Sequence, residues 1–179
     1  MKIYYIHGFG SNVNSTTRSL LENELGEPVI GLTYDVKDPA GSLEKMIAIL
    51  EQNEADESII IGASLGGWYA DQLSKRCIAD YVLYNPAMSP WTELRELTDD
   101  IDITANLYKY KDFSMQYVPN MSKTVFLATD DKVINYKYAA YTFKDSAEIV
   151  YIDGGHRLTQ KNIGLVVDKI KTIKNQLLG

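Results

Sequence analysis

A serine flanked by glycines lies between a predicted strand and a predicted helix. The segment GASLG, residues 62–66, follows the β-branched run 59–61 and precedes a stretch compatible with a helix. In this context Gly-x-Ser-x-Gly is typical of a nucleophile elbow, a sharp turn that presents the serine hydroxyl at its apex. Glycine is needed on both sides because a Cβ there would collide with the neighbouring strand or helix. Ser64 is therefore the candidate nucleophile; the alternative is a plain strand-to-helix turn that happens to contain a serine.

A serine hydroxyl is a weak nucleophile until a base removes its proton, and the chain has two histidines to do so, His7 and His156. His156 follows the last predicted strand and is preceded by two glycines, which allow the loop to place the imidazole over Ser64. We predict His156 as the general base. His7 is the runner-up, and a histidine in a glycine-rich surface loop is the alternative interpretation of His156.

A carboxylate is required to fix the tautomer of the histidine and to stabilise the imidazolium. Asp130 and Asp131 follow the fifth predicted strand, and because they are adjacent their side chains diverge, so only one of them can face His156. Asp131 is the first choice and Asp130 the alternative. Asp153 is expected to cap a turn, and Asp35 follows the second strand, a less usual place for the acid.

Strands that alternate with helices predict a parallel sheet covered on both faces, and the strands are nearly continuous apolar runs, as burial on both faces requires. The expected strands cover residues 2–7, 28–34, 58–63, 80–85, 124–129 and 148–153, with helices at 16–25, 39–50, 65–77, 136–144 and 161–178. We predict one α/β domain over residues 1–179, a three-layer α/β/α sandwich with a mostly parallel sheet of about six strands. The serine, the acid and the histidine each follow a strand, at the edge where such sheets bind ligands.

The alternation is interrupted between residues 87 and 120, where there is no strand signal and one short helical pattern, near 91–97. This insertion is rich in aromatic residues. It is expected either to form a wall of the substrate pocket or to cover the core.

Composition excludes several classes of function. The 179 residues carry a net charge of −6, which argues against binding to nucleic acid or to an anionic membrane surface. There is no apolar run long enough to span a membrane, and one cysteine with two histidines argues against a thiolate metal cluster or a histidine-rich zinc site. Nucleotide-binding glycine motifs are absent. We expect a cytoplasmic protein without cofactor or metal; the oligomeric state is not indicated.

The motifs together resemble the α/β-hydrolase superfamily, and most closely its small YqiA-like bacterial esterases. They are YIHGFGS (5–11), GASLGGWYA (62–70), YNPAMSP (84–90), TDDKVINY (129–136) and DGGHRL (153–158). The resemblance implies an esterase for short acyl esters, and it places the acid at Asp131, because TDDKVINY is similar to a family pattern Thr-Gly-Asp-x-Val-x-x-Tyr. Asp130 stands where that pattern has glycine.

The same resemblance implies an oxyanion hole formed by the backbone amides of Phe9 and Leu65, with His7 orienting the loop that contains Phe9. The predicted function is a serine hydrolase for small acyl esters that works through an acyl-enzyme. A thioesterase or amidase of the same mechanism, and a non-catalytic binding protein on the same fold, are the alternatives.

Overall fold

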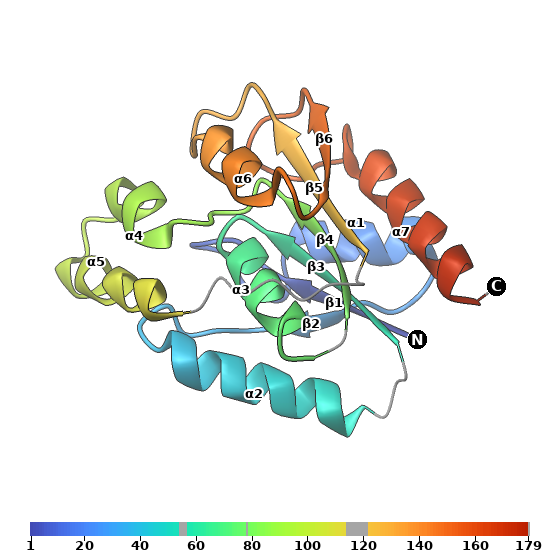
Figure 1. Ribbon diagram of the computed structural model, residues 1–179, viewed down its shortest axis with the longest axis horizontal. Coiled ribbons are helices and arrows are strands. Elements are labelled where there is room, and N and C mark those ends of the chain that lie inside the picture. Colours follow the sequence, from blue (N-terminus) through green and yellow to red (C-terminus); the bar gives the residue numbers. More distant parts are fainter. Residues whose placement is uncertain (54–56, 78, 114–121, 179) are drawn as a thin grey trace.

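The six expected strands form one parallel sheet in the computed structural model (Figure 1), which describes residues 1–53, 57–77, 79–113 and 122–178. Their order in the sheet is β2-β1-β3-β4-β5-β6, and every neighbouring pair is parallel. The strands are β1 (Lys2–Ile6), β2 (Ile30–Leu32), β3 (Ser58–Ala63), β4 (Asp80–Tyr84), β5 (Lys123–Ala128) and β6 (Glu148–Ile152). The predicted α/β sandwich with a parallel six-stranded sheet is confirmed.

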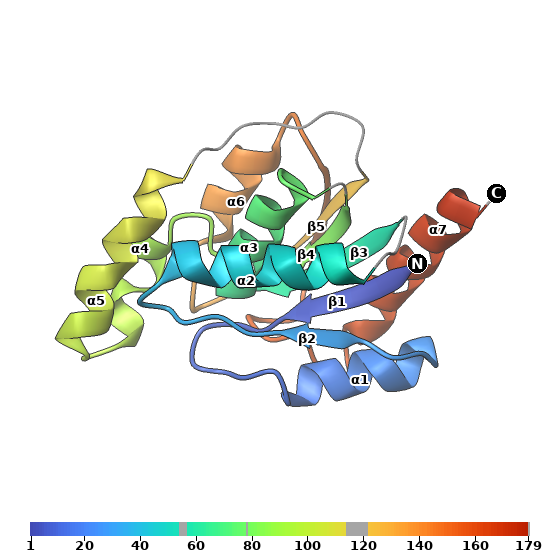
Figure 2. The same ribbon diagram turned by 90° about the horizontal axis from the view of Figure 1, so that it is seen from below.

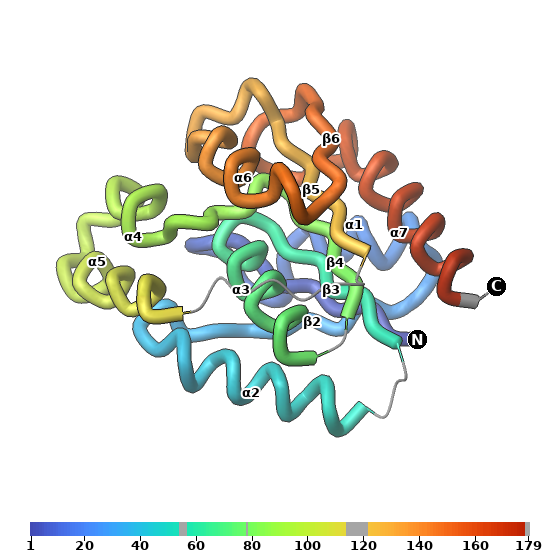
Figure 3. The backbone as a smooth tube through the Cα atoms, in the orientation of Figure 1, coloured from blue at the N-terminus to red at the C-terminus, as the bar shows by residue number. Residues whose placement is uncertain are grey.

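The direction of the chain across the sheet reverses at β1. The backbone runs from β1 outward to β2 and then returns past β1 to β3, as the path in Figure 3 shows. The loops that leave the carboxyl ends of β1 and β3 therefore diverge, and crevices that bind ligands form at such switch points. The register pairs Ile6 with Gly62, so the residues that follow these two strands, including Ser64, lie close together.

Helices cover both faces of the sheet (Figure 2), and two buried clusters separate them from it. On one face α2 (Pro39–Gln52), α3 (Leu65–Ser74) and α6 (Tyr136–Phe143) bury their apolar stripes. On the other face α1 (Thr16–Leu25) packs beside α7 (Ile163–Leu178). The apolar side of α7 is buried at Ile163, Val166, Val167, Ile170 and Ile173.

Local sequence accounts for the helix boundaries. The side chain of Asp38 accepts a hydrogen bond from Gly41 N at 3.0 Å, and Pro39 occupies the first helical position of α2, where its missing N–H costs nothing. Ser15 caps α1, which ends at Gly26 in the left-handed conformation. Across the described ranges, none of the helices is both long and apolar enough to cross a membrane.

The segment after β4 contains more helix than the sequence predicted. The expected helix near residues 91–97 is present as α4 (Pro90–Glu93) and the 3₁₀ turn η1 (Arg95–Leu97), but α5 (Ile101–Leu107) and η2 (Tyr108–Asp112) were not expected. Sequence periodicity misses α5 because Leu107 is its one buried residue, while Ile101 is 85% exposed. Residues 114–120 of the predicted insertion lie outside the described residues, and the single-domain organisation stays a prediction.

Candidate active site

Ser64 forms a sharp turn between β3 and α3. Its backbone has φ +52° and ψ −121°, a conformation that costs a residue with a side chain about 1–3 kcal/mol. Three backbone hydrogen bonds hold the turn: Ser64 N donates to Tyr84 O at 3.1 Å, and Ser64 O accepts from Gly67 N at 2.9 Å and Ala87 N at 3.0 Å. The surrounding strands therefore enforce a strained turn with Ser64 at its apex.

The glycines of the turn are required by close packing. A Cβ at Gly62 would lie 2.5 Å from Gly66 O, and one at Gly66 would overlap the carbonyl oxygen of Ile6 at the end of β1. A Cβ at Gly67 would lie 2.5 Å from the side chain of Pro86. The first turn of α3 thus packs directly against β1 and the segment after β4, and the expected clash of a Cβ at Gly62 or Gly66 with a neighbouring strand or helix is confirmed.

His156 and Asp131 form a hydrogen-bonded pair beside this turn. His156 lies in the loop after β6, and its Nδ1 is 2.7 Å from Asp131 Oδ2. Asp131 Oδ1 accepts from Val133 N at 2.7 Å and from Ile134 N at 3.2 Å, so both carboxylate oxygens are bonded, and the Asp131 side chain is fully buried. A carboxylate held in this way accepts the Nδ1 proton, which leaves Nε2 of His156 as a proton acceptor.

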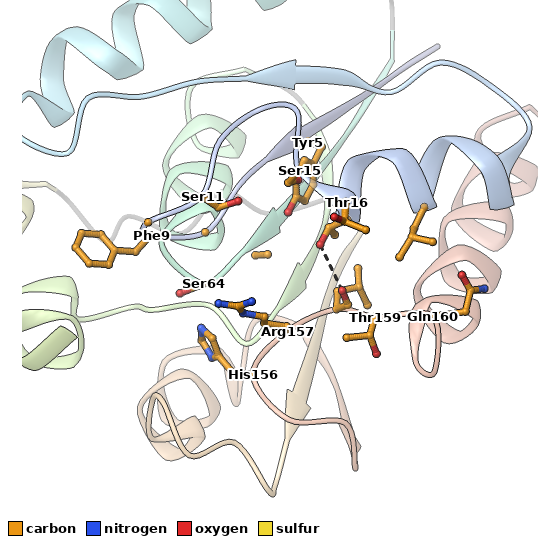
Figure 4. Close-up of a pocket in the computed structure, with 16 residues that line it drawn as sticks. Tyr5, Phe9, Ser11, Ser15, Thr16, Ser64, His156, Arg157, Thr159 and Gln160 are labelled. Atoms are coloured by element: carbon orange, nitrogen blue, oxygen red, sulfur yellow. Dashed lines mark hydrogen bonds between the residues drawn. The ribbon is translucent and has the colours of Figure 1, made fainter. Parts of the chain in front are cut away.

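Ser64 and His156 line the same pocket, where Figure 4 shows both side chains. Within the described ranges the hydroxyl of Ser64 has no hydrogen-bond partner, so it is free to be approached by the imidazole. Hydrogen bonds between nucleophile and base commonly tighten only when substrate is bound. The arrangement supplies a hydroxyl, an imidazole and a carboxylate in the order that nucleophilic catalysis needs.

The structure separates the other candidate acids from His156. Asp130 Oδ1 accepts from Gly154 N at 3.0 Å and Gly155 N at 2.9 Å, and these two bonds lower the pKa of the Asp130 carboxyl. Asp153 accepts from the hydroxyl of Thr129 at 3.2 Å. Asp35 accepts from Lys37 N at 2.9 Å, in the loop after β2. Asp130 thus anchors the loop that contains His156, a role that sequence reasoning missed.

His7 lies in a different environment from His156. It is 5% exposed, its Nδ1 lies 3.0 Å from Gly8 O, and burial lowers the pKa of its imidazole. The ring stacks on Tyr34 at a centroid distance of 4.5 Å, and Tyr34 stacks on Tyr69 at 4.6 Å. His7 does not line the pocket with Ser64. Its position suits the loop-orienting role better than that of a base.

The two amides expected in the oxyanion hole are available. A Cβ at Gly8 would lie 3.3 Å from Ser64 Cβ, so the loop after β1 passes directly over the serine. The N–H of Phe9 in that loop and the N–H of Leu65 at the start of α3 make no hydrogen bonds to other residues in the described part of the chain. Both belong to segments that flank Ser64, where a developing oxyanion would lie.

Asn85 is a site residue whose role the sequence did not reveal. Its Nδ2 donates to Gly155 O at 2.8 Å and to His156 O at 3.2 Å, while its Oδ1 accepts from Ala128 N at 2.7 Å. The side chain is buried and the backbone φ is +43°. Asn85 therefore ties the ends of β4 and β5 to the histidine loop. The available signal was an asparagine at a buried strand end, followed by proline.

The pocket beside Ser64 has a volume of about 630 Å³. Its walls are the loop after β1 with the first turn of α1, and the loop from His156 to Gln160; the hydroxyl of Thr17 joins the two walls by donating to Leu158 O at 3.3 Å. No described residue of the 87–120 insertion lines this pocket. Instead Leu94, Leu107 and Tyr110 are buried in the core beside α3, as the core-covering alternative expected.

Comparison with known proteins agrees with this architecture. Est1E from Butyrivibrio proteoclasticus superposes with a TM-score of 0.74 at 16% identity, covering 99% of this chain and 89% of that chain. Alpha/beta hydrolase domain-containing protein 10 from mouse gives a TM-score of 0.74 at 14% identity, covering 98% and 90%. At these identities the likeness establishes the fold, which is that of the α/β hydrolases.

Sequence comparison gives the family. UPF0227 protein YcfP from Salmonella arizonae is 25% identical over 183 residues, covering 96% of this chain and 98% of the relative. Residues 2–175 match the model of the family described as "Uncharacterised protein family (UPF0227)". The chain therefore belongs to the UPF0227 family and has the α/β-hydrolase fold.

Proposed function

We propose that this protein is a serine hydrolase that cleaves small acyl esters, with Ser64 as nucleophile, His156 as base and Asp131 as the carboxylate that orients it. The observation that carries the proposal is the 2.7 Å bond between His156 and the buried Asp131, in the same pocket as a serine held at φ +52°. A protein that catalyses no reaction has no need of a serine, a histidine and an aspartate in this arrangement. The α/β-hydrolase fold of the structural neighbours supports hydrolysis but does not identify the bond that is cleaved.

The reaction has two stages, the formation and the hydrolysis of an acyl-serine. Nε2 of His156 removes the proton as Ser64 Oγ attacks the acyl carbonyl, and the amides of Phe9 and Leu65 stabilise the resulting oxyanion. The imidazolium, stabilised by Asp131, then protonates the departing alcohol and leaves an acyl-serine. His156 next activates a water molecule, which attacks the acyl-serine and releases the carboxylic acid and free Ser64.

The proposal is tested by reacting the protein with a fluorophosphonate and measuring its intact mass, followed by peptide mapping. We expect one adduct per chain on Ser64, and no adduct on a folded Ser64→Ala variant. Absence of the adduct on the folded wild-type chain would overturn the proposal in favour of a non-catalytic binding protein. Matched ester, thioester and amide substrates then distinguish the esterase from a thioesterase or amidase of the same mechanism.

The cell compartment and the substrate partner form part of the same proposal. A small-molecule ester fits a pocket of about 630 Å³, which is within the range of about 300–1,000 Å³ typical of small-molecule sites. We propose a cytoplasmic location, because the chain has a single cysteine, Cys77, and so cannot form an internal disulfide.

A further inference from the structure

The charge of the pocket beside Ser64 is opposite to that of the whole chain. The chain has a net charge of −6, but the residues that line the pocket include no Asp or Glu and one arginine, Arg157. The pocket is therefore the place where this acidic protein presents a positive charge next to its candidate nucleophile.

The carboxylates that follow the neighbouring strands are bonded elsewhere. Asp131 is bonded to His156 and two backbone amides, and Asp130 is bonded to the amides of Gly154 and Gly155. Neither carboxylate lines the pocket, and neither forms an ion pair with Arg157. Neither of these two aspartates therefore neutralises the arginine.

Arg157 itself has an anchored backbone and a free side chain. Its carbonyl oxygen accepts from Asn162 Nδ2 at 3.4 Å, and the next residue, Leu158, is buried. Within the described ranges its guanidinium makes no hydrogen bond or ion pair. Arg157, Ser64 and His156 line the same pocket, and Figure 4 shows the guanidinium directed from the loop after β6 toward Ser64. A guanidinium binds a carboxylate or phosphate through two parallel hydrogen bonds, and such a ligand would supply the partner that the protein does not.

The opposite wall is neutral and combines hydroxyl groups with the apolar side chains of Phe9 and Leu20. Ser11 and Thr16 line it with hydroxyls suited to hydrogen-bond the oxygens of a polar substrate, whereas the hydroxyl of Ser15 caps α1 by accepting from Arg18 N at 3.4 Å. A long aliphatic chain that displaces water here would leave the hydroxyls of Ser11 and Thr16 and the guanidinium of Arg157 without partners, which is costly. The lining therefore favours a short, polar, negatively charged substrate over a fatty acyl ester.

We propose that Arg157 determines substrate specificity by binding a carboxylate or phosphate group of the ester while Ser64 attacks its acyl carbon. This inference rests on the proposed function, because it assigns a substrate class to the same site. It adds that the ester is anionic, and that the residue after the catalytic histidine recognises the anion.

The test compares matched esters. On the alcohol side these are phenyl acetate, 4-acetoxybenzoate and 4-acetoxyphenyl phosphate; on the acyl side they are the 4-nitrophenyl esters of valerate and of glutarate, the latter with a free carboxylate. We expect kcat/KM for the anionic ester of at least one set to exceed that of its neutral partner by about ten- to a hundredfold, the range for a hydrogen bond to a charged group. The preference should decrease as ionic strength rises, because Arg157 is exposed.

Two variants, Arg157→Gln and Arg157→Lys, test the inference. The control is Lys45→Gln, which removes one positive charge from the exposed surface of α2. Arg157→Gln should lose the preference while retaining hydrolysis of neutral esters and fluorophosphonate labelling of Ser64. Arg157→Lys should keep part of the preference, and Lys45→Gln all of it.

Two results would overturn the inference and they are distinguishable. If Ser64 is labelled but wild type shows no anionic preference, or if Arg157→Gln retains it, the substrate assignment is wrong while the hydrolase stands. If Ser64 is not labelled and no ester is cleaved, the proposed function is wrong and the inference is lost with it.

Discussion

The two histidines of this chain occupy equivalent places in sequence and very different places in the structure. Each lies next to a glycine in a loop just after a strand of the same sheet. His156 lines a pocket and is bonded to a buried carboxylate, whereas His7 is 5% exposed, stacked on Tyr34 and bonded to the carbonyl of its neighbour Gly8. Position at a strand end therefore selects candidates, but the partner of the second ring nitrogen and access to the pocket distinguish them.

The partners of the two histidines also distinguish the proposed base from the residue that is expected to orient a loop. A carboxylate at Nδ1 stabilises a positive charge on His156 when it takes a proton. His7 has no such partner among the described residues: its Nδ1 lies 3.0 Å from Gly8 O, and burial lowers the pKa of its imidazole, as expected of a residue that orients the loop rather than of a base. Loss of His156 should therefore abolish the reaction, whereas loss of His7 should only make the position of the loop that contains Phe9 less well defined.

Replacement of the two histidines tests this contrast and has the largest expected effect. We expect His156→Ala to lower kcat/KM for a nitrophenyl ester by about 10⁴-fold or more, the scale of losing a triad base. His7→Phe retains an aromatic ring for stacking on Tyr34 and should cost about tenfold or less, with a lower midpoint of thermal unfolding. Steady-state rates and circular dichroism measure both. Equal losses in the two folded variants would contradict the distinction.

Asp130 and Asp131 form a second pair with different expected roles, because Asp131 bonds the imidazole of His156 and Asp130 bonds the loop that contains it. Asp131→Asn leaves the shape of the site but removes the charge at His156, and we expect kcat/KM to fall by about 10³- to 10⁴-fold. Asp130→Ala removes two bonds to the loop that contains His156, and about a tenfold loss is expected because the imidazole is positioned less firmly. The same kinetic assay measures both variants, and a larger loss for Asp130→Ala would reverse the assignment of the acid.

Sequence reasoning succeeded where a single local rule determines the outcome. The strands β1, β3, β4 and β5 are mostly apolar because they are buried on both faces of the sheet. Gly62, Gly66 and Gly67 are glycines because the first turn of α3 packs directly against β3, β1 and Pro86. Such constraints leave a direct mark on residue type. For that reason the sequence predicts both the parallel six-stranded sheet and the turn at Ser64.

Prediction from the sequence was incomplete where the structure depends on contacts between segments that are distant in the chain. Asp130 and Asp131 have the same local sequence signal, and only the loops after β5 and β6 together determine which of them meets His156. The bonds of Asn85 likewise join residues about 43 to 71 positions apart. The walls of the pocket come from residues near 5–20 and 156–160, so neither could be inferred from spacing within one segment.

The carboxylate of Glu93 is expected to have a smaller effect, on the stability of the fold and not on the reaction. It lies at the end of α4, where its Oε2 accepts from Ser89 N at 2.6 Å, and its Oε1 is buried without a hydrogen-bond partner in the described ranges. Burial, assisted by the charge of Asp131, raises the pKa of Glu93 to about 7. The folded state thus retains a proton that the unfolded state loses from about pH 4.5 upward, so this residue makes the fold progressively less stable as pH rises to about 7.

Replacing Glu93 by glutamine keeps the hydrogen bond acceptor and removes the charge. Because one pKa unit corresponds to about 1.4 kcal/mol, we expect Glu93→Gln to be more stable than wild type at pH 8 by up to about 3 kcal/mol, and equally stable near pH 4.5. Urea unfolding at a series of pH values measures this, with Glu96→Gln, an exposed glutamate three residues away, as control. Parallel curves for wild type and Glu93→Gln would show that Glu93 is already ionised in the folded protein, and that its charge beside Asp131 is tolerated at no cost.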